Sequence, residues 1–594
     1  MTAGNSSQRE VSDVERRKLM RNIGAVTGAG ILLPASAGCF GLGDDDDDID
    51  IDDDNGIIDD DGEDDGDDVE DVGAGDPIPE FVFASYTVDE DPIRYETAVL
   101  TTEMWNELGI PVEHEPMEIG AILDMTFDEK NHDVMGVRRG GQAFRADPDF
   151  FLYDSYHSSQ VGGAGTPNIA GFDDPDYDEL VEAQRVADDP DERLDLVFEA
   201  QEYLAREVPD IQVMHQWRVH ALNTERFQNP EPGLPGEGLF GWANFHQIEP
   251  TSDDVSTLTF GYAGGGFEAV NPMRPFPTQD YLYLNLIYDT AVRVTPEGDW
   301  MEWGAEQVER VDAETIDLAI RDDMEFHDGE PVTPEDVAFS FNYGVEQELG
   351  EGWGQVEEAE VGGDLDVRIH LEAPSATFEM MGLSRVYFVP QHIWEDIDDP
   401  LTLGSDEIDR TGSGIYEFDF WDPDDQGRLE LFEDHWNPAN VPELIFIPAS
   451  GMSPIMRGFL DEDIDMVVWE LNLEQIEDVE GTDFGDTYEM PDVGHHIISI
   501  NQYKHEMFED VALRRAMATA VPEEDIMAVT LGGLRDDGGY AEHNYSPITP
   551  GNEAWHNPDI PEEYRYHFDM EEARNILEEA GYTWDDEDRL HLPE

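Results

Sequence analysis

Two short stretches of the sequence carry side chains that could bind a ligand or a metal ion. Residues 138–146 read Arg-Arg-Gly-Gly-Gln-Ala-Phe-Arg-Ala and contain no acidic residue. The guanidinium groups of Arg138 and Arg139 could bind a carboxylate or a phosphate through paired hydrogen bonds, or they could pair with acidic side chains of the protein itself. His495 and His496 could bind a metal ion, but neighbouring residues of a strand point to opposite faces, so we predict no metal site there.

The sequence lacks the common short motifs of enzyme active sites. It contains no Gly-x-Ser-x-Gly, no Gly-x-x-x-x-Gly-Lys-Ser/Thr and no His-Glu-x-x-His. Gly264-Gly265-Gly266 follows a strand-like stretch, but no helix and acidic residue at the right distance complete a dinucleotide-binding fingerprint. We therefore predict a protein that binds without catalysing a reaction and that uses no cofactor.

The single cysteine, Cys39, lies where a lipid could be attached. Arg16 and Arg17 begin a basic segment, and the apolar stretch after it is too short and too rich in Gly and Ala to span a membrane. The stretch ends in Ser-Ala-Gly-Cys, which is similar to a lipobox. Residues 1–39 are therefore predicted to be a twin-arginine lipoprotein signal with Cys39 as the lipidation site. We expect the mature protein at the extracellular face of the cell membrane, anchored by this lipid.

The composition limits the class of partner. The 594 residues include 141 Asp or Glu and 31 Lys or Arg, which gives a formal net charge of −110. Phosphate backbones repel such a polyanion, so nucleic acid is excluded as a partner. An acid-rich, lysine-poor chain suits molar salt, where the Debye length is about 3 Å and self-repulsion is screened, so we infer an extreme halophile. Residues 40–79 are rich in Asp and Gly and are predicted to form an extended linker.

Beyond residue 79 the sequence alternates between strand-like and helix-like segments, which indicates an α/β fold. The predicted strands lie at 81–84, 109–112 and 257–260, with further strands and turns through Glu433. The predicted helices lie at 98–108, 176–208, 511–520 and 570–580. In the 176–208 region the apolar residues form one stripe, which we expect to face the core.

Several motifs resemble those of a known family. Residues 326–337, Phe-His-Asp-Gly-Glu-Pro-Val-Thr-Pro-Glu-Asp-Val, resemble the signature of the extracellular solute-binding proteins of peptide-type ABC transporters, the dipeptide- and oligopeptide-binding group. Residues 411–416 are similar to the family's Gly-Thr-Gly-Pro-Tyr turn, and residues 458–466 are similar to its Gly-x-x-Asp segment. Residues 500–501 resemble its crossing strand, residues 508–516 its Val-Arg-x-Ala helix, and residues 572–582 its Ala-Gly-Tyr helix. The resemblance covers roughly residues 80–594.

The resemblance implies a two-lobed α/β fold of the type II periplasmic-binding-protein kind. One lobe would comprise residues 216–494, and the other would comprise 80–215 together with 495–594. Hinge strands near His215 and Ile497 would join the lobes, which would close on a ligand between them. The resemblance further implies a monomer that captures a peptide-like or other small solute and delivers it to the permease subunits of an ABC importer.

The family segments occur in an unexpected order. In the family the Ala-Gly-Tyr helix lies past the middle of the chain and precedes a Gly-Ile-x-Val strand and an Asp-Pro segment. Here the corresponding pieces, 108–112 and 147–149, come first. We interpret this order as a circular permutation, with new ends in the loop after the Ala-Gly-Tyr helix and the former ends joined near 247–256. The alternative is a fusion of two fragments left by recombination between tandem genes.

The resemblance also suggests which residues line the ligand site. They belong to the first cleft loop, the 411–416 turn, the crossing strand, the arginine-rich stretch and the aromatic walls: Gly265, Gly266, Phe267, Asn271, Tyr283, Ser413, Asn501, Arg138, Arg139, Gln142, Phe144, Tyr156 and Trp217. The aromatic members could instead be ordinary core residues. In the family an Asp just before the Asp-Pro segment meets the amino terminus of the peptide. Its absence from 138–146 favours an anionic or neutral ligand.

Two alternatives to a transport function follow from the same sequence. A sensory or scaffold relative would bind a ligand and present it to a receptor instead of a permease. A non-functional recombinant of two binding-protein fragments would fail to fold even in molar salt.

Overall fold

A computed structural model of the chain describes residues 73–594 with short gaps: 89, 142–144, 162–165, 188, 234–235, 264–270, 274–277, 348, 350–351, 364, 404–407, 423–425 and 450. Arg16, Arg17, Cys39 and most of the predicted linker therefore lie outside the described residues. Within the described part of the chain, no helix combines the length and the apolar character needed to cross a membrane.

A mixed sheet of twelve strands runs through the centre of the described structure. Its main path, in spatial order, is β14 (Tyr416–Trp421), β15 (Gly427–Leu431), β16 (Glu443–Ala449), β7 (Thr257–Ala263), β17 (Met466–Val467), β4 (Asp210–Asn223), β19 (His495–Ile500), β3 (Val134–Arg139), β1 (Phe81–Tyr86) and β2 (Val112–Met117). Two further strands, β18 (Gly485–Pro491) and β20 (Ala541–Glu542), pair with β4. Helices alternate with these strands along the chain, which confirms the predicted mixed α/β class.

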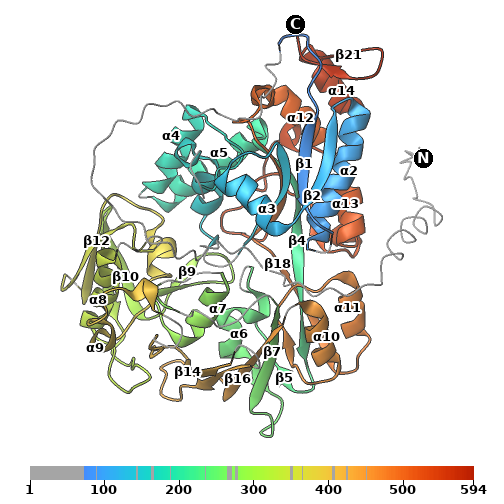
Figure 1. Cartoon of the computed structure of the whole chain (residues 1–594). Coiled ribbons are helices and arrows are strands. Elements are labelled where there is room, and N and C mark those ends of the chain that lie inside the picture. Colours follow the sequence, from blue (N-terminus) through green and yellow to red (C-terminus); the bar gives the residue numbers. More distant parts are fainter. Residues whose placement is uncertain are drawn as a thin grey trace, which may run out of the picture.

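Strand β4 belongs to both halves of this sheet. Its first residues pair with β19, and its last seven residues, from Trp217 to Asn223, pair with β18. Residues 492–494 connect β18 to β19, so the chain from β18 to β19 forms a second run antiparallel to β4. These two crossing runs extend between an upper part (residues 73–214 and 495–594) and a lower part (residues 217–490) (Figure 1). Side chains on these two runs are thus placed where the parts meet.

The core of the upper part combines residues from distant stretches of the sequence. It is formed by side chains from 78–134, 208–214 and 498–590. Trp105 is fully buried in this core, and its indole Nε1 donates a 2.9 Å hydrogen bond to the carbonyl of Met517. The helices around it are α2 (Pro92–Leu108), α3 (Ile119–Leu123), α12 (Val511–Thr519), α13 (Glu523–Thr530) and α14 (Met570–Glu579).

The helical region predicted at 176–208 is divided into two helices, α4 (Pro175–Arg185) and α5 (Pro190–Glu207). The division follows from local chemistry, because Pro190 takes the first helical position and Asp189 caps the new amino end by accepting backbone hydrogen bonds. The strand predicted at 109–112 begins only at Val112. Gly109 ends α2 in the left-handed region with φ 92°, and a Cβ there would lie 2.5 Å from the carbonyl oxygen of Asp588.

The lower part has its own core, drawn from residues between 222 and 468. A separate antiparallel sheet is covered by helix α8 (Pro334–Glu346) and consists of β10 (Ala305–Asp312), β11 (Thr315–Ile320), β13 (Val367–Leu371) and β12 (Val356–Val361). The remaining helices here are α6 (Trp242–Gln247), α7 (Thr278–Ile287), α9 (Gln391–Trp394), α10 (Met452–Leu460) and α11 (Leu473–Glu480). Short strand pairs complete it: β5 (Phe227–Gln228) with β6 (Glu249–Pro250), and β8 (Val292–Val294) with β9 (Trp300–Glu302).

Two segments far apart in the sequence lie side by side at the tip of the upper part (Figure 1). There β21 (Thr583–Trp584) and β22 (Leu590–His591) form a hairpin next to residues 75–78. The amide of Gly75 donates to the carbonyl of Pro593 over 3.1 Å, and the amide of Leu592 donates to the carbonyl of Asp76 over 2.9 Å. The backbone that leads into β1 is thus hydrogen-bonded to the segment that follows α14.

Candidate functional site

An aromatic cluster lies where the upper and lower parts meet. Trp242, Trp303 and Trp436 pack edge to face, with ring centroids 4.8 Å apart in both the 242–303 and 303–436 pairs. Ala146 of the upper part packs into the same cluster together with Met380. The indole Nε1 of Trp303 donates to the buried carboxylate of Asp289 over 2.7 Å, which fixes the ring position.

A groove of about 600 Å³ is lined by residues of both parts. The upper part contributes one wall from α4, Val186 and the helical turn Phe150–Asp154, and the lower part contributes the other from residues just before β12 and just after β13. Its lining residues are Tyr153, Glu179, Glu182, Ala183, Arg185, Val186, Gly354, Gln355, Glu372, Ala373, Pro374 and Ser375.

The groove carries an excess of negative charge. Glu179, Glu182 and Glu372 are exposed in its walls, and the one cation among its lining residues is Arg185. Nε of Arg185 lies 3.2 Å from the carboxylate of Asp149, whose pKa is raised to about 7 by burial. The electrostatics of the groove therefore favour a solute with a positively charged group.

One edge of the groove is closed by backbone contacts between the two parts. The amide of Ala376 in the lower part donates to the carbonyl of Arg185 over 2.6 Å. The guanidinium of Arg193 donates to the carbonyl of Ala376 over 3.2 Å and to the buried carboxylate of Asp147 over 2.8 Å. Separating the parts would break the two bonds to Ala376, so these bonds belong to the conformation in which the parts touch. The Arg193–Asp147 pair lies within the upper part.

Four charged residues form a network at the two crossing runs. Nη2 of Arg138 lies 2.7 Å from Oε1 of Glu470 and 2.7 Å from Oδ2 of Asp492. Nε of Arg218 lies 3.0 Å from the same oxygen of Asp492. Burial alone would raise the pKa of Asp492, but Arg218 and Arg138 hold it well below the usual range. Arg138 comes from the upper part and Glu470 from the lower part, so the network ties the parts together.

Arg139 is held by a different acid. Its guanidinium lies 3.3 Å from the carboxylate of Asp210 and 5.3 Å from the ring centroid of Tyr156. The hydroxyl of Tyr156 donates to the same carboxylate over 2.9 Å, and burial followed by the charge of Asp210 raises the pKa of this tyrosine well above its usual value. Since Arg138 and Arg139 both have acidic partners, the arginine pair provides no support for an anionic ligand.

The other described residues of the predicted site make local structural contacts and are not brought together. Asn271 donates to the carbonyl of Pro400, Ser413 accepts from the amide of Asp289, and Asn501 donates to the carbonyls of Lys130 and His132. Tyr283 is buried among Phe240 and Phe446. Trp217 donates to Glu542 over 2.8 Å and lies beneath the guanidinium of Arg535.

The predicted residues of the two cleft loops, Gly265, Gly266, Phe267, Gln142 and Phe144, lie outside the described residues. Sequence reasoning missed the tryptophan cluster and the acidic groove. The tryptophans lie at 242, 303 and 436 with no regular spacing, so only the folded chain brings them together.

The 326–337 motif has a clear structural role. Thr333 and Asp336 form a capping box at the start of α8, with Pro334 in the first helical turn. The imidazole of His327 contacts the carbonyl of Gly414 over 3.0 Å and accepts from the amide of Gly412 over 3.2 Å. Burial lowers the pKa of His327 to about 4, so the ring is neutral at pH 7 and fit to accept this bond. The 326–337 motif and the 411–416 turn, which are distant in sequence, are thus hydrogen-bonded to each other.

Comparison with known proteins agrees with these motifs. Residues 300–593 match the model of the bacterial extracellular solute-binding proteins, family 5 Middle. This match supports a family 5 solute-binding protein. The matched segment contains the 326–337 motif, two of the four residues of the charged network, Glu470 and Asp492, and the last two tryptophans of the cluster.

Individual relatives align with part of the chain. The oligopeptide-binding protein AppA of Bacillus subtilis is 25% identical over 296 residues, which is 47% of this chain and 51% of AppA. The probable peptide-binding protein YejA of Agrobacterium fabrum is 25% identical over 41% of this chain and 39% of YejA. The chain thus spans about half or less of the length of these relatives. The solved structure of B. subtilis AppA with a nonapeptide is 20% identical, with a TM-score of 0.41 over 56% of this chain and 65% of that one.

Proposed function

We propose that this protein is the substrate-binding component of an ABC importer and that it captures a peptide-like or other small solute between its two parts. The observation that carries the proposal is the groove lined from both parts, which are joined through the two crossing runs. The family 5 match and the names of the peptide-binding relatives support the same role. Permease subunits would then be the partners of a monomeric binding protein.

Binding would proceed by closure of the two parts. One part would rotate against the other about β4 and the run from β18 to β19, which stay paired during the motion. This rotation would make or break the contacts of Ala376 with Arg185 and Arg193. A solute that contacts both walls of the groove would favour the closed conformation, because only that conformation offers both walls at once. The permease would recognise the closed form.

The charge of the groove favours a solute with a cationic group, such as the amino terminus or a basic side chain of a peptide. This differs from the anionic or neutral ligand suggested by the arginine-rich stretch, whose first two arginines are occupied by Glu470, Asp492 and Asp210.

A ligand screen by thermal unfolding tests the proposed function. We expect one class of di- or oligopeptides to raise the unfolding temperature of the full chain in molar KCl, because a ligand at 100 times its Kd adds about 2.7 kcal/mol to the native state. Sugars and small carboxylates serve as comparison ligands. The double variant E182Q/E372Q should weaken binding by about two- to fivefold, whereas E357Q/E358Q on the outer strand β12 should not. Absence of any stabilising solute would contradict the proposal.

We further propose that the chain is a circularly permuted form of the family fold. The contacts between residues 75–78 and 590–593 support it, because they place the end of the α14 hairpin next to the backbone that enters β1. Around the proposed join of the former ends, residues 251–254 are exposed. The fusion of two gene fragments would also produce this order, but it gives no reason for these contacts.

A rearranged chain tests the permutation. The test chain runs from 254 to 594, continues through a short Gly/Ser linker, and then runs from 73 to 253. Its free energy of unfolding should lie within about 1 kcal/mol of that of the natural order, because no buried contact is cut. Circular dichroism during heating in molar KCl measures this. A matched chain opened at the buried Val493 between β18 and β19 should fail to fold. Loss of the cooperative transition in the first chain would contradict the permutation.

The cellular setting of the protein is also proposed. Export by the twin-arginine pathway and a lipid on Cys39 would hold the protein at the extracellular face of the membrane. The linker predicted at 40–79 would end before Gly75, because residues 75–78 are hydrogen-bonded to residues 590–593. The charge of −110 supports a halophilic source, because it requires screening by salt.

A further inference from the structure

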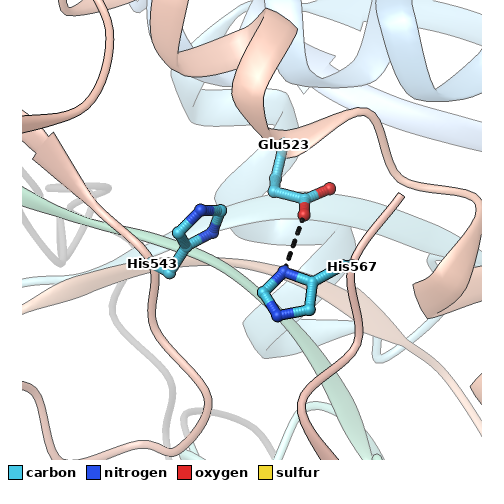
Figure 2. A group of neighbouring side chains, drawn as sticks. All are labelled: Glu523, His543 and His567. Carbon is cyan, nitrogen blue, oxygen red and sulfur yellow. Dashed lines mark ion pairs between the residues drawn. The ribbon is translucent and has the colours of Figure 1, made fainter. Parts of the chain in front are cut away.

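A group of two histidines and one glutamate lies on the upper part, away from the groove. It consists of Glu523 at the start of α13, His543 after β20, and His567 before α14. One carboxylate oxygen of Glu523 and one ring nitrogen of each histidine all lie within 4.8 Å of one another (Figure 2). Three separate segments of the chain thus direct potential ligand atoms to one point.

The distances are close to those of a metal centre. A tetrahedral ion with ligands at about 2.1 Å requires ligand atoms about 3.4 Å apart. Nδ1 of His567 already lies 3.5 Å from Oε1 of Glu523. His567 is exposed and His543 half-buried, so small side-chain rotations can bring the remaining atoms into range, whereas Glu523 is buried and fixed.

Tyr545 lies beside both imidazoles. The ring of Tyr545 stacks on His543 at 11° with centroids 6.0 Å apart, and its hydroxyl lies 3.5 Å from Nε2 of His567. A contact at Nε2 leaves Nδ1 of His567 to face the carboxylate, which is the arrangement by which outer groups orient metal-bound histidines. Nε2 of His543 lies 3.8 Å from the exposed carboxylate of Glu524.

We propose that Glu523, His543 and His567 form a binding site for a divalent transition-metal ion of the zinc type. Two imidazoles select against Mg²⁺ and Ca²⁺, which prefer oxygen ligands, and favour Zn²⁺, Co²⁺, Ni²⁺ or Cu²⁺. Three protein ligands leave a fourth position for water. The bound ion would link the start of α13 to the loops before α14 and after β20, and the site does not depend on the proposed solute-binding function.

Titration of the full chain with Co²⁺ tests the site, with Mg²⁺ in excess to occupy surface carboxylates. We expect one equivalent of Co²⁺ to produce the intense visible absorption of tetrahedral nitrogen and oxygen coordination, and Zn²⁺ to abolish it by displacement. The variants H543A and H567A should each weaken Co²⁺ binding by at least about tenfold. E523Q should weaken it as well.

A control variant distinguishes the site from general binding to an acidic surface. The double variant H370A/H392A removes two histidines outside the site, one 3.7 Å from Glu360 and one 2.8 Å from Asp328, and it should bind Co²⁺ as the unchanged protein does. Unfolding temperatures in the presence of a chelator should be the same for all variants, which shows that each is folded. Equal Co²⁺ affinity in the site and control variants, or an absorption spectrum without tetrahedral bands, would overturn the proposal.

Discussion

Replacement of Asp492 by alanine is expected to lower the free energy of unfolding by about 3–5 kcal/mol, because it leaves two guanidinium groups without their buried partner. The carboxylate is fully buried and lies 2.7 Å from Arg138 and 3.0 Å from Arg218. Only Glu470, with a side chain 27% exposed, would remain to balance them. Chemical denaturation in molar KCl measures the change. The variant D419A, which removes a partially exposed partner of Arg428, should cost less than about 1 kcal/mol.

The same residue gives a pH dependence with a definite sign. The folded-state pKa of Asp492 is lowered, so its contribution is complete above the unfolded-state value of about 3.9 and is lost as pH falls below it. Below pH 4 the unchanged protein should therefore lose stability more steeply than D492A does. Parallel curves for the two proteins would show that the network does not stabilise the charged carboxylate.

Replacement of Trp105 by alanine is expected to lower the free energy of unfolding by about 3–5 kcal/mol as well, because it opens a large cavity and removes a buried hydrogen bond. The ring stacks on Phe83 with centroids 5.7 Å apart, and its Nε1 donates to the carbonyl of Met517. The unfolding temperature measured by calorimetry should fall accordingly. W300A, at a half-buried ring of the lower part, should have a clearly smaller effect.

This substitution also tests whether the distant segments of the upper part form one unit. If residues 78–134 and 498–590 share a core, W105A should also weaken the protection of amides in α12 against hydrogen exchange. Unchanged protection in α12 would show that the two segments are stable independently of each other.

Local sequence patterns predicted the elements whose signals are strong. The strand that begins at Phe81 and the helices that begin at Val511 and Met570 lie where periodicity and capping residues placed them. The break between α4 and α5 was missed, although Asp189 and Pro190 are a typical helix start. The apolar stripe continues through both helices, so by itself it predicted one helical region.

The geometry of the candidate site could be predicted only in part. The sequence left open whether Arg138 and Arg139 bind a ligand or acids of the protein, because their partners Glu470 and Asp210 are set by the packing of strands distant in sequence. The groove is likewise formed by α4 and by residues 354–375, which no sequence motif links. Pairings of this kind depend on tertiary structure and leave no local signal.

The shared core of the upper part has a consequence for the order in which the chain folds during synthesis. Trp105 and Met517 are 412 positions apart, so the ribosome must complete most of the chain before that contact can form. The lower part draws its core from within 222–468 and can fold earlier. Until α12 to α14 emerge, the apolar surface of β1 and α2 that these helices cover stays exposed, and exposed apolar surface of this kind promotes aggregation of a nascent chain.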